Sequence, residues 1–580
     1  MMKQWSSRRS WAVWLSCAAL VSGLLAGCSG SGGTSAQEEA GSTAQTGQEQ
    51  GQNAGKSESA QEPGQEAGTI PSQSAQAEVD EQPSDVYYEI FVRSFYDSDG
   101  DGVGDLRGVI EKLDYLNDGN PDTTDDLGVT GIWLMPINPS PSYHGYDVTD
   151  YRAIHPDYGT LEDFKALLAE AEKRGIKVIM DLVVNHTSTE HPWFKEAAAA
   201  PNSPNRDWYV WAEDQGKKPT GSSAAGSGTP WHELNGAHYM GTFWGGMPDL
   251  NFDNPKVREE MKDIGAYWLE MGADGFRIDA AKHIYEDLMS DKGEATTAKN
   301  TAWWQEFRSR MNEVNPDAYI VGEIWDNSAA IIAPYLDKAF DSGFNFGLGE
   351  SMIGAVTNEK DNNLAFTLER TYGLFSKVSG GSFSDAAFLT NHDMNRVMTQ
   401  LNGNLDHAKM AAGILLTMPG NPFIYYGEEI GMRGAKPDEQ IREPMIWSNT
   451  GSDKGQTTWE PLKHNRGDQV EGVVQQTDDP GSLLSRYRTL IAWRHEMPAL
   501  NRGTIESFAS GNESVMAYVR RTKDSKALVV HNLSGKEQRV ELAGTSGGDL
   551  FKALAKTTDD RAALNGSSLT LPPYTTAVLE

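Results

Sequence analysis

Short apolar runs alternate with amphipathic segments along most of the chain. Residues 131–137 (GIWLMPI) form an apolar run that predicts a buried strand. Thr160, with Asp163 three residues later, predicts the start of a helix that ends at Gly175. The apolar residues 176–184 (IKVIMDLVV) predict the next strand. A strand followed by a helix is therefore the expected unit of this chain.

The same unit recurs further along. Asn254 and Pro255 open a predicted helix, Gly272 closes it, and residues 275–280 (GFRIDA) form the strand that follows. Successive strand–helix units favour a parallel sheet in an α/β fold. Their number favours a closed (β/α)8 TIM barrel over a doubly wound sheet.

Two intervals break this rhythm. Residues 186–249 are rich in Trp, Gly, Pro and Ser without clear periodicity, so we expect a small domain inserted after the third strand. Beyond residue 500, short strand-like runs (SVMAYVRR, KALVVHNLS and TTAVLE) with glycine-containing turns predict an antiparallel β-sandwich over residues 501–580. The barrel is therefore expected to comprise residues 85–185 and 250–500.

The N-terminus has the layout of an export signal. Arg8 and Arg9 precede an apolar run that is too short for a stable membrane span, and Leu25-Ala26-Gly27-Cys28 looks like a bacterial lipobox. That resemblance implies that residues 1–27 are removed and that Cys28 carries a diacylglycerol on its sulfur. The protein is then exported and lipid-anchored at the outer face of the cell membrane. An ordinary signal peptide cleaved nearby and twin-arginine export are the alternatives.

Composition separates the next segment from the folded part. Residues 28–84 are dominated by Gly, Ser, Gln, Glu and Ala and contain no aromatic residue, so they cannot bury enough apolar surface to offset the entropy of ordering. We expect a disordered tether. The formal net charge of −32 argues against nucleic acid or an anionic membrane surface as a partner and suits a neutral substrate. The two cysteines are Cys17 and Cys28, so the predicted domains contain no disulfide.

Three acidic residues, Asp279, Glu323 and Asp393, stand where a predicted strand ends in a loop. The carboxyl ends of parallel barrel strands meet at one mouth of the barrel, so we expect these side chains to lie together. Hydrolysis of a glycosidic bond needs an acid to protonate the leaving oxygen and a carboxylate to meet the developing positive charge. Retaining enzymes hold the two roughly 5 Å apart. The pattern predicts a glycoside hydrolase that acts on α-linked glucans.

Neighbouring residues suggest different roles for the first two acids. Arg277 lies two residues before Asp279 on the same face of the strand, and its guanidinium is expected to keep Asp279 ionised as the nucleophile. Glu323 follows an apolar run and precedes Trp325. An apolar environment and neighbouring carboxylates raise the pKa of a carboxyl group, as a general acid requires.

Several segments together resemble the α-amylase family of glycoside hydrolases over about residues 85–580. The matching segments are YHGYDVTDY (143–151), DLVVNH (181–186), MPDLN (247–251), GFRIDAAKH (275–283), VGEIW (321–325), TNHD (390–393) and MPGNPFIYYGEEIG (418–431). The resemblance is closest to secreted bacterial lipoprotein α-amylases. It implies a retaining hydrolase of α-glucans that acts as a monomer, with Asp393 as a third carboxylate that grips substrate hydroxyls.

The resemblance also implies substrate-binding residues. Two histidines are expected to donate hydrogen bonds to the sugar at the cleavage point, a tyrosine to form the stacking platform beneath it, and a Lys-His pair to reach a leaving-group subsite. With the arginine before the nucleophile, the expected set is Tyr146, His186, Arg277, Lys282, His283 and His392.

Residues 86–96 (VYYEIFVRSFY) form a β-rich run that predicts the first strand, and the loop that follows it has the spacing of a calcium site. Asp97, Asp99, Asp101 and Asp105 occupy positions one, three, five and nine of a loop with glycine at position six, and the Val103 carbonyl is the remaining expected ligand. Position twelve lacks the closing Glu of an EF-hand, but a similar loop occurs in the α-amylase family. An acidic turn without a metal is the alternative.

The family resemblance implies a second calcium ion at the junction with the inserted domain. Its expected ligands are Asn185, Asp249 and the backbone carbonyl of His283.

Three functions remain open at this point. The first is an α-amylase that cuts internal α-1,4 bonds of starch, glycogen and maltodextrins, which Lys282, His283 and the short inserted domain support. The second is an α-glucosidase, oligo-1,6-glucosidase or neopullulanase/cyclomaltodextrinase type of activity, which residues 247–251 and the loop at 96–108 support. The third is a lipid-anchored starch-binding scaffold without catalysis, and the complete set of three acids argues against it.

Overall fold

The computed structural model describes residues 84–580, apart from residues 224, 226–227, 286–293, 450–452, 468 and 546. The predicted export signal, Cys28 and all but the last residue of the predicted tether lie outside the described residues. Among the described residues, no helix is long and apolar enough to cross a membrane.

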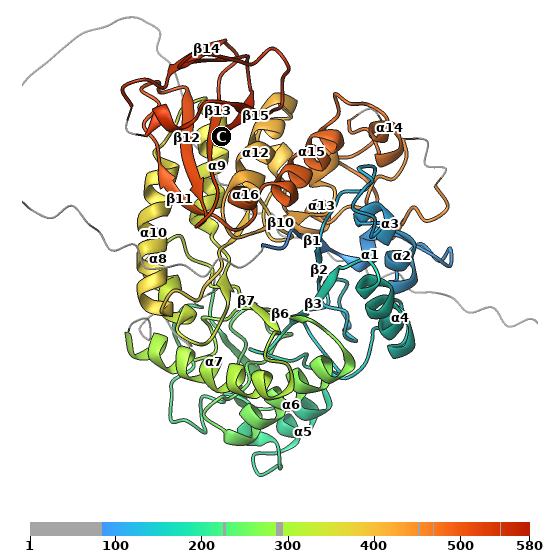
Figure 1. Ribbon diagram of the computed structural model, residues 1–580. Coiled ribbons are helices and arrows are strands. Elements are labelled where there is room, and N and C mark those ends of the chain that lie inside the picture. Colours follow the sequence, from blue (N-terminus) through green and yellow to red (C-terminus); the bar gives the residue numbers. More distant parts are fainter. Residues whose placement is uncertain are drawn as a thin grey trace, which may run out of the picture. The chain divides into compact units, whose positions relative to one another are not determined.

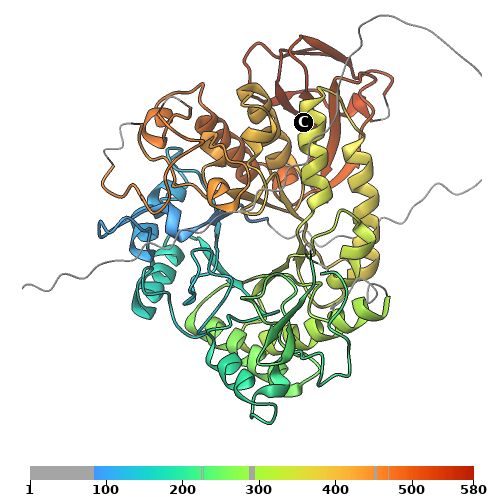
Figure 2. The ribbon, with the colours of Figure 1, turned by 180° about the vertical axis from the view of Figure 1, so that it is seen from behind.

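Eight parallel strands form the central sheet (Figures 1 and 2). In chain order they are β1 (Tyr87–Ile90), β2 (Gly131–Leu134), β3 (Lys177–Leu182), β6 (Gly275–Ile278), β7 (Tyr319–Gly322), β8 (Ser342–Gly343), β9 (Ala386–Phe388) and β10 (Asn421–Tyr425). Their spatial order is β8-β7-β6-β3-β2-β1-β10-β9, and a parallel bridge between Phe344 and Ala386 joins the two outer strands. The sheet is thereby closed, and the predicted TIM barrel is confirmed.

Aromatic side chains fill the interior of the barrel. Tyr87 stacks on Phe423 with 4.8 Å between ring centroids, and Trp133 lies 5.5 Å from Phe344. All four side chains are buried. The barrel is a packed core, so the strand ends above it are held in fixed positions.

Helices lie on the outer side of the barrel (Figures 1 and 2). The longer ones are α4 (Leu161–Glu172), α6 (Pro255–Met271), α7 (Glu294–Val314), α9 (Phe346–Thr357), α10 (Leu364–Ser379), α12 (Leu405–Thr417) and α15 (Leu483–Glu496). Both helices predicted from capping signals are confirmed. Thr160 and Asp163 form a capping box at the start of α4. Asn254 caps α6, which ends at Gly272 with a φ of 110°.

Shorter helices occupy the connections. They are α1 (Val92–Phe95), α2 (Leu106–Glu111), α3 (Leu113–Leu116), α8 (Ala329–Ile332), η3 (Ala333–Leu336), α11 (Val397–Gln400), η4 (Glu428–Ile430), α13 (Asp438–Ile441), α14 (Val473–Thr477) and α16 (Pro498–Arg502). The helix α1 corrects an expectation, because the sequence favours a β-rich run from residue 86 to 96. The strand ends at Ile90, and within α1 the Ser94 hydroxyl donates to the Arg442 carbonyl, 348 residues away, at 2.6 Å, a contact that no local pattern can predict.

The segment between β3 and α6 has its own small structure. It contains α5 (Pro192–Ala199), η1 (Arg206–Trp208) and a hairpin of β4 (Trp231–Leu234) and β5 (Ala237–Met240). The hairpin turns at Asn235-Gly236, whose φ values are 54° and 80°. This pair is the strongest local signal of a two-residue hairpin turn, although the hairpin was not predicted from the sequence.

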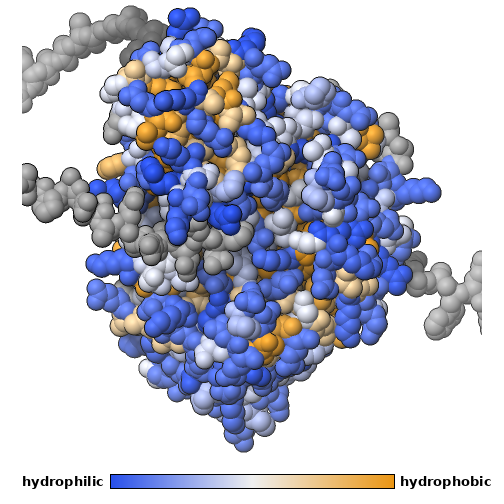
Figure 3. Space-filling model, in the orientation of Figure 1, coloured by the Kyte–Doolittle hydropathy of each residue, from blue (hydrophilic) through white to orange (hydrophobic). Residues whose placement is uncertain are grey.

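The C-terminal region folds into two antiparallel sheets, ordered β11-β12-β13-β18-β15 and β14-β17-β16. The strands are β11 (Thr504–Ser507), β12 (Val515–Arg521), β13 (Lys526–Asn532), β14 (Gln538–Glu541), β15 (Leu554–Thr557), β16 (Ala563–Asn565), β17 (Ser568–Leu571) and β18 (Thr576–Leu579). Val530 of the first sheet and Leu569 of the second share one apolar cluster, which confirms the predicted β-sandwich. The face in Figure 3 is mostly hydrophilic, and apolar side chains gather over these C-terminal strands.

Candidate active site

The three predicted catalytic acids surround one cavity. Asp279 follows β6, Glu323 follows β7 and Asp393 lies in the loop after β9. All three line a cavity of about 530 Å³. Asp279 and Glu323 are only 8% and 7% exposed. The barrel therefore brings together the acids that the sequence predicts.

Arg277 joins two of these acids through one guanidinium. Its Nη1 lies 2.8 Å from Asp279 Oδ1, and its Nη2 lies 3.0 Å from Glu323 Oε1. Nη1 also donates to Asp181 Oδ1 on β3 at 2.8 Å. One positive charge and three carboxylates are thus held together largely out of water. Two carboxylates that contact one guanidinium lie close together, as a retaining glycosidase requires.

The backbone beside Asp279 positions Glu323. Ala280 has a φ of 49°, a left-handed conformation that non-glycine residues rarely adopt. In this conformation its amide donates to Glu323 Oε2 at 2.9 Å. Glu323 therefore has one oxygen on the Ala280 amide and the other on Arg277. These two contacts fix the orientation of its carboxyl group.

The electrostatic environment of Asp279 and Glu323 differs from the one that the sequence predicts. Burial raises the pKa of Asp279 and of Glu323, and the charge of Arg277 opposes the rise at both. The direction suits a general acid at Glu323. The sequence tied Arg277 to Asp279 as the group that keeps it ionised, whereas the structure shares this cation with Glu323 and Asp181. Burial also raises the pKa of Asp181, to about 7. The ionisation of Asp279 therefore depends on how three acids share one guanidinium.

Asp393 has cations of its own. Its Oδ1 lies 2.8 Å from Arg442 Nη2, and its Oδ2 lies 3.1 Å from His392 Nε2. Burial alone raises the pKa of Asp393, but His392 and Arg442 outweigh it and hold this pKa well below its usual range. Asp393 is therefore ionised at neutral pH.

His392 lies between Asp393 and a second acid, Glu89 of β1. Its Nδ1 is 2.5 Å from Glu89 Oε1. Burial lowers the pKa of the imidazole, but Asp393 and Glu89 outweigh it and raise the pKa of His392 to about 9. The ring is thus protonated at neutral pH and can donate from both nitrogens.

Tyr146 and His186 lie at the same cavity, where the resemblance implies sugar contacts. The Tyr146 ring packs nearly parallel to His392 at 5.6 Å, and its hydroxyl donates to Asp181 at 3.1 Å. His186 Nε2 lies 3.2 Å from the Tyr146 carbonyl. Burial lowers the pKa of His186 to about 4, so this ring is neutral. The Tyr146 ring and the His186 imidazole are therefore held in place relative to each other.

Lys282 and His283 also line the cavity. Lys282 Nζ donates to the Trp325 carbonyl at 2.6 Å. The His283 ring meets Phe243 of the inserted segment edge-on at 5.5 Å. Phe243 and Trp325 are 39% and 43% exposed. Two large exposed rings therefore border the cavity, and sugar rings stack on such surfaces.

Three members of this network were not predicted from the sequence: Glu89, Asp181 and Arg442. Glu89 and Asp181 lie inside apolar, strand-forming runs, and a carboxylate at such a position was the available signal. Arg442 lies in the connection after β10, and nothing in the local sequence distinguishes it.

The predicted calcium loop brings three of its acids together. Asp97, Asp99 and Asp105 each offer a carboxylate oxygen, and these atoms lie within 4.8 Å of one another. Asp101 lies outside this group, and its Oδ1 accepts from the Val103 amide at 2.8 Å. Converging carboxylate oxygens fit the ligand preference of Ca²⁺. The contributions of Asp101 and Val103 stay predictions.

The second predicted calcium site has a different environment. Asn185 Nδ2 lies 3.3 Å from Asp249 Oδ1, and the amide and hydroxyl of Thr242 also donate to the Asp249 carboxylate. Protein donors thus surround Asp249. The assignment of Asn185, Asp249 and the His283 carbonyl to calcium stays a prediction.

Two family models match the chain. The model described as "Alpha amylase, catalytic domain" matches residues 89–503, and the model described as "Alpha-amylase SusG C-terminal domain" matches residues 515–578. The first match includes the barrel and all three acids around the cavity. The second covers most of the two C-terminal sheets.

The chain is also similar to named proteins over most of its length. Alpha-amylase 3 of Dictyoglomus thermophilum is 46% identical over 449 residues, which is 77% of this chain and 84% of that protein. The trehalose-6-phosphate hydrolase of Bacillus subtilis is 33% identical over 555 residues, 85% of this chain and 97% of that protein. The crystal structure of alpha-amylase from H. orenii is 47% identical with a TM-score of 0.79, covering 86% of this chain and 99% of that chain.

Proposed function

The chain belongs to the α-amylase family of glycoside hydrolases, and from this premise we propose that it is a retaining α-amylase that cuts internal α-1,4 bonds of starch, glycogen and maltodextrins. The observation that carries the proposal is the contact of one guanidinium, Arg277, with both Asp279 and Glu323 inside one cavity. That contact gives two carboxylates at short range, which is the requirement for hydrolysis through a covalent intermediate.

The proposed reaction has two steps. Glu323 gives its proton to the glycosidic oxygen while an oxygen of Asp279 bonds to the anomeric carbon, and the old carbon–oxygen bond breaks. The leaving chain departs with the proton. Glu323 then takes a proton from water, whose oxygen bonds to the anomeric carbon and releases Asp279. Each residue thus returns to its starting state.

Asp393 would hold the reacting sugar, because an ionised carboxylate accepts hydrogen bonds from hydroxyl groups. The resemblance implies that His392 also touches the sugar, but its ring is fully buried and its nitrogens lie against Glu89 and Asp393, so it is proposed as a positioning residue for Asp393. Arg442 is proposed as a positioning residue, because it contacts Asp393 at 2.8 Å and helps to keep it ionised. Tyr146 would place an aromatic face against the same sugar.

Support for attack on internal bonds comes from two sources. The proteins at 46% and 47% identity are both named alpha-amylases. Phe243 and Trp325 add exposed rings at the cavity border, which suits a substrate longer than one sugar. The alternative is an oligosaccharide-directed enzyme of the α-glucosidase, oligo-1,6-glucosidase or neopullulanase/cyclomaltodextrinase type. The likeness to a trehalose-6-phosphate hydrolase supports that alternative.

The decisive experiment follows the products of soluble starch, pullulan, isomaltose and cyclodextrin over time. An early ladder of mixed malto-oligosaccharides from starch is expected. Release of mainly glucose from chain ends would establish the alternative. Nuclear magnetic resonance of the first product should show the α-anomer, and a β-anomer would contradict retention.

Calcium is proposed as a structural cofactor of the loop at residues 97–105. Asp97, Asp99 and Asp105 would hold it through carboxylate oxygens, and the ion would fix this loop after β1. A second ion near Asn185 and Asp249 is proposed on the family resemblance.

We also propose that the protein is exported and anchored through a lipid on Cys28, on the strength of the lipobox-like residues 25–28. Labelling of cells with a radioactive or clickable fatty acid tests this. The chain should carry the label, and a Cys28→Ser variant should lose it. An unlabelled wild-type chain in the medium would indicate an ordinary signal peptide.

A further inference from the structure

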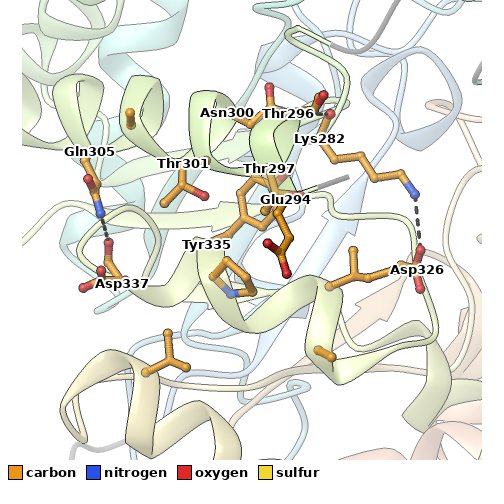
Figure 4. Close-up of a pocket in the computed structure, with 16 residues that line it drawn as sticks. Lys282, Glu294, Thr296, Thr297, Asn300, Thr301, Gln305, Asp326, Tyr335 and Asp337 are labelled. Carbon is orange, nitrogen blue, oxygen red and sulfur yellow. Dashed lines mark hydrogen bonds and ion pairs between the residues drawn. The ribbon is translucent and has the colours of Figure 1, made fainter. Parts of the chain in front are cut away.

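A second and larger pocket adjoins the catalytic cavity. Its volume is about 840 Å³, and it lies between α7 and the α8–η3 segment. Lys282 lines both this pocket and the catalytic cavity. Figure 4 shows Lys282 extending toward Asp326 at one end of the pocket, whereas Gln305 meets Asp337 at the other. We propose that this pocket binds the leaving-group portion of a long α-glucan chain, which deepens the proposed function and rests on it.

The two spaces meet on the side of the proposed general acid. Glu323 and Trp325 line the catalytic cavity, and Asp326, which follows them directly, lines the pocket. Lys282 Nζ donates to the Trp325 carbonyl at 2.6 Å and lies 3.5 Å from Asp326. The general acid protonates the leaving oxygen, so a chain that leaves on this side passes Trp325 and reaches the pocket.

The chemistry of the walls suits a neutral sugar. The α7 wall offers neutral hydrogen-bonding groups from Thr296, Thr297, Asn300, Thr301 and Gln305. The opposite wall offers apolar surface from Ala330, Ile331, Pro334 and Tyr335. A pyranose has polar edges and apolar faces, so walls of both kinds match it. Three acids, Glu294, Asp326 and Asp337, face a single lysine among the lining residues, which disfavours a phosphate or another anion.

The size of the pocket suits more than one sugar unit. Along α7 it extends from Glu294 to Gln305, which at about 1.5 Å per residue is roughly 16 Å. That length exceeds one pyranose ring. Occupancy of the pocket should therefore add affinity only for substrates that extend well beyond the cleaved bond.

The test narrows the pocket without touching the catalytic residues. Ala298 and Ala302 are exposed positions of α7 that line it, and they are one helical turn apart. The double variant Ala298→Leu/Ala302→Leu places two apolar side chains in the pocket while keeping good helix formers. Ser309→Leu is the matched control, because Ser309 is an exposed position of the same helix outside the pocket lining.

The readout compares kcat/KM on amylose with kcat/KM on maltotetraose. In the double variant we expect a fall of about three- to tenfold on amylose, the value of one or two lost contacts, and no change on maltotetraose. The inference would be overturned if the double variant and the wild type had equal kcat/KM on amylose. It would also be overturned if kcat/KM of the double variant fell equally on amylose and maltotetraose. Ser309→Leu should match the wild type on both.

A binding measurement separates this inference from the proposed function. Calorimetry with maltoheptaose is performed on Glu323→Gln, with and without the two leucines. Weaker binding in the presence of the leucines supports the pocket even if the wild type proves inactive on starch, a result that would sink the proposed function alone. Unchanged maltoheptaose binding refutes the pocket.

Discussion

Two pairs of buried carboxyl groups in this barrel differ in what surrounds them. Asp279 and Glu323 share the guanidinium of Arg277 and border a cavity. Glu428 and Glu429 are even more deeply buried, in η4 after β10. Within the part of the chain that the structure describes, neither Glu428 nor Glu429 forms an ion pair. The two pairs therefore separate the effect of burial from the effect of a counter-charge.

Hydroxyl groups satisfy the second pair. Tyr487 donates to Glu428 Oε1 at 2.8 Å, and Tyr88 and Tyr115 both donate to Glu429 Oε1 at 2.6 Å. Burial raises the pKa of Glu428 to about 8, so this group is mostly a neutral carboxylic acid at pH 7. Burial alone thus yields a neutral structural acid. Asp279 and Glu323 differ from this acid because they share a cation and border a cavity.

The largest expected effect is on catalysis. Asp279→Asn should lower kcat/KM on starch by at least about 10⁴-fold, because the proposed nucleophile is lost. Glu323→Gln should lower it by about 10²–10⁴-fold, because proton donation is lost. Initial rates of reducing-sugar release measure both.

Glu428→Gln is the matched control for these variants, since it also changes one buried carboxyl group to an amide. It should keep activity within about twofold, because an amide closely resembles the neutral acid and still accepts from Tyr487. Equal losses in Glu428→Gln and Glu323→Gln would show that the two pairs do not differ in role.

Removal of the shared cation should have the next largest effect. Arg277→Met leaves Asp279, Glu323 and Asp181 buried without it, which should lower the free energy of unfolding by about 3–5 kcal/mol at pH 7. The loss should be smaller at pH 5, where these carboxyls can take up protons. The shift in the midpoint of unfolding by guanidinium chloride, measured at both pH values, tests this. An equal loss of stability at pH 7 and pH 5 would indicate an effect of packing rather than of charge. Arg277→Lys keeps a positive charge and should lose less stability than Arg277→Met.

The neutral pair predicts a smaller, pH-dependent effect. The pKa of Glu428 is raised from 4.5 to about 8, so its stabilising contribution is full below pH 4.5 and is lost as the pH rises to about 8. Glutamine does not titrate. Between pH 5 and 8 the stability of Glu428→Gln should therefore rise relative to the wild type, by roughly 2–4 kcal/mol. Chemical denaturation across this range measures it, and a constant difference between the two proteins would contradict the buried neutral acid.

Local signals predicted much of the fold. The caps Thr160 and Asn254 fixed the starts of α4 and α6, because capping involves residues within one helical turn. The strand-end acids Asp279, Glu323 and Asp393 were found because a barrel places such positions at one mouth.

The contacts that tune these acids were not predictable in the same way. Arg442 reaches Asp393 across 49 residues, and Glu89 reaches His392 across 303. Such pairs exist only once the barrel has closed, so no local pattern marks them. The sharing of Arg277 among three carboxylates has the same origin, since Asp181 and Glu323 come from the strands on either side of Arg277's own.

The smallest expected effect concerns three carboxylates of the loop at residues 97–105, of which Asp97 and Asp105 are buried and Asp99 is exposed. Asp97, Asp99 and Asp105 bring three oxygens together, and among the described residues none of the three forms an ion pair. A bound Ca²⁺ would supply the missing positive charge. Chelation of the wild type should then lower Tm by about 2–4 °C, because the ion binds only the folded loop. Added Ca²⁺ should restore it, and Asp97→Asn should have a lower Tm that no longer responds to the chelator. An identical response to the chelator in the wild type and Asp97→Asn would locate the ion elsewhere. No response in either protein would mean that this loop is an acidic turn without a metal. Its own amide hydrogen bonds would then hold it, such as the one that Gly100 donates to Asp97 at 2.6 Å.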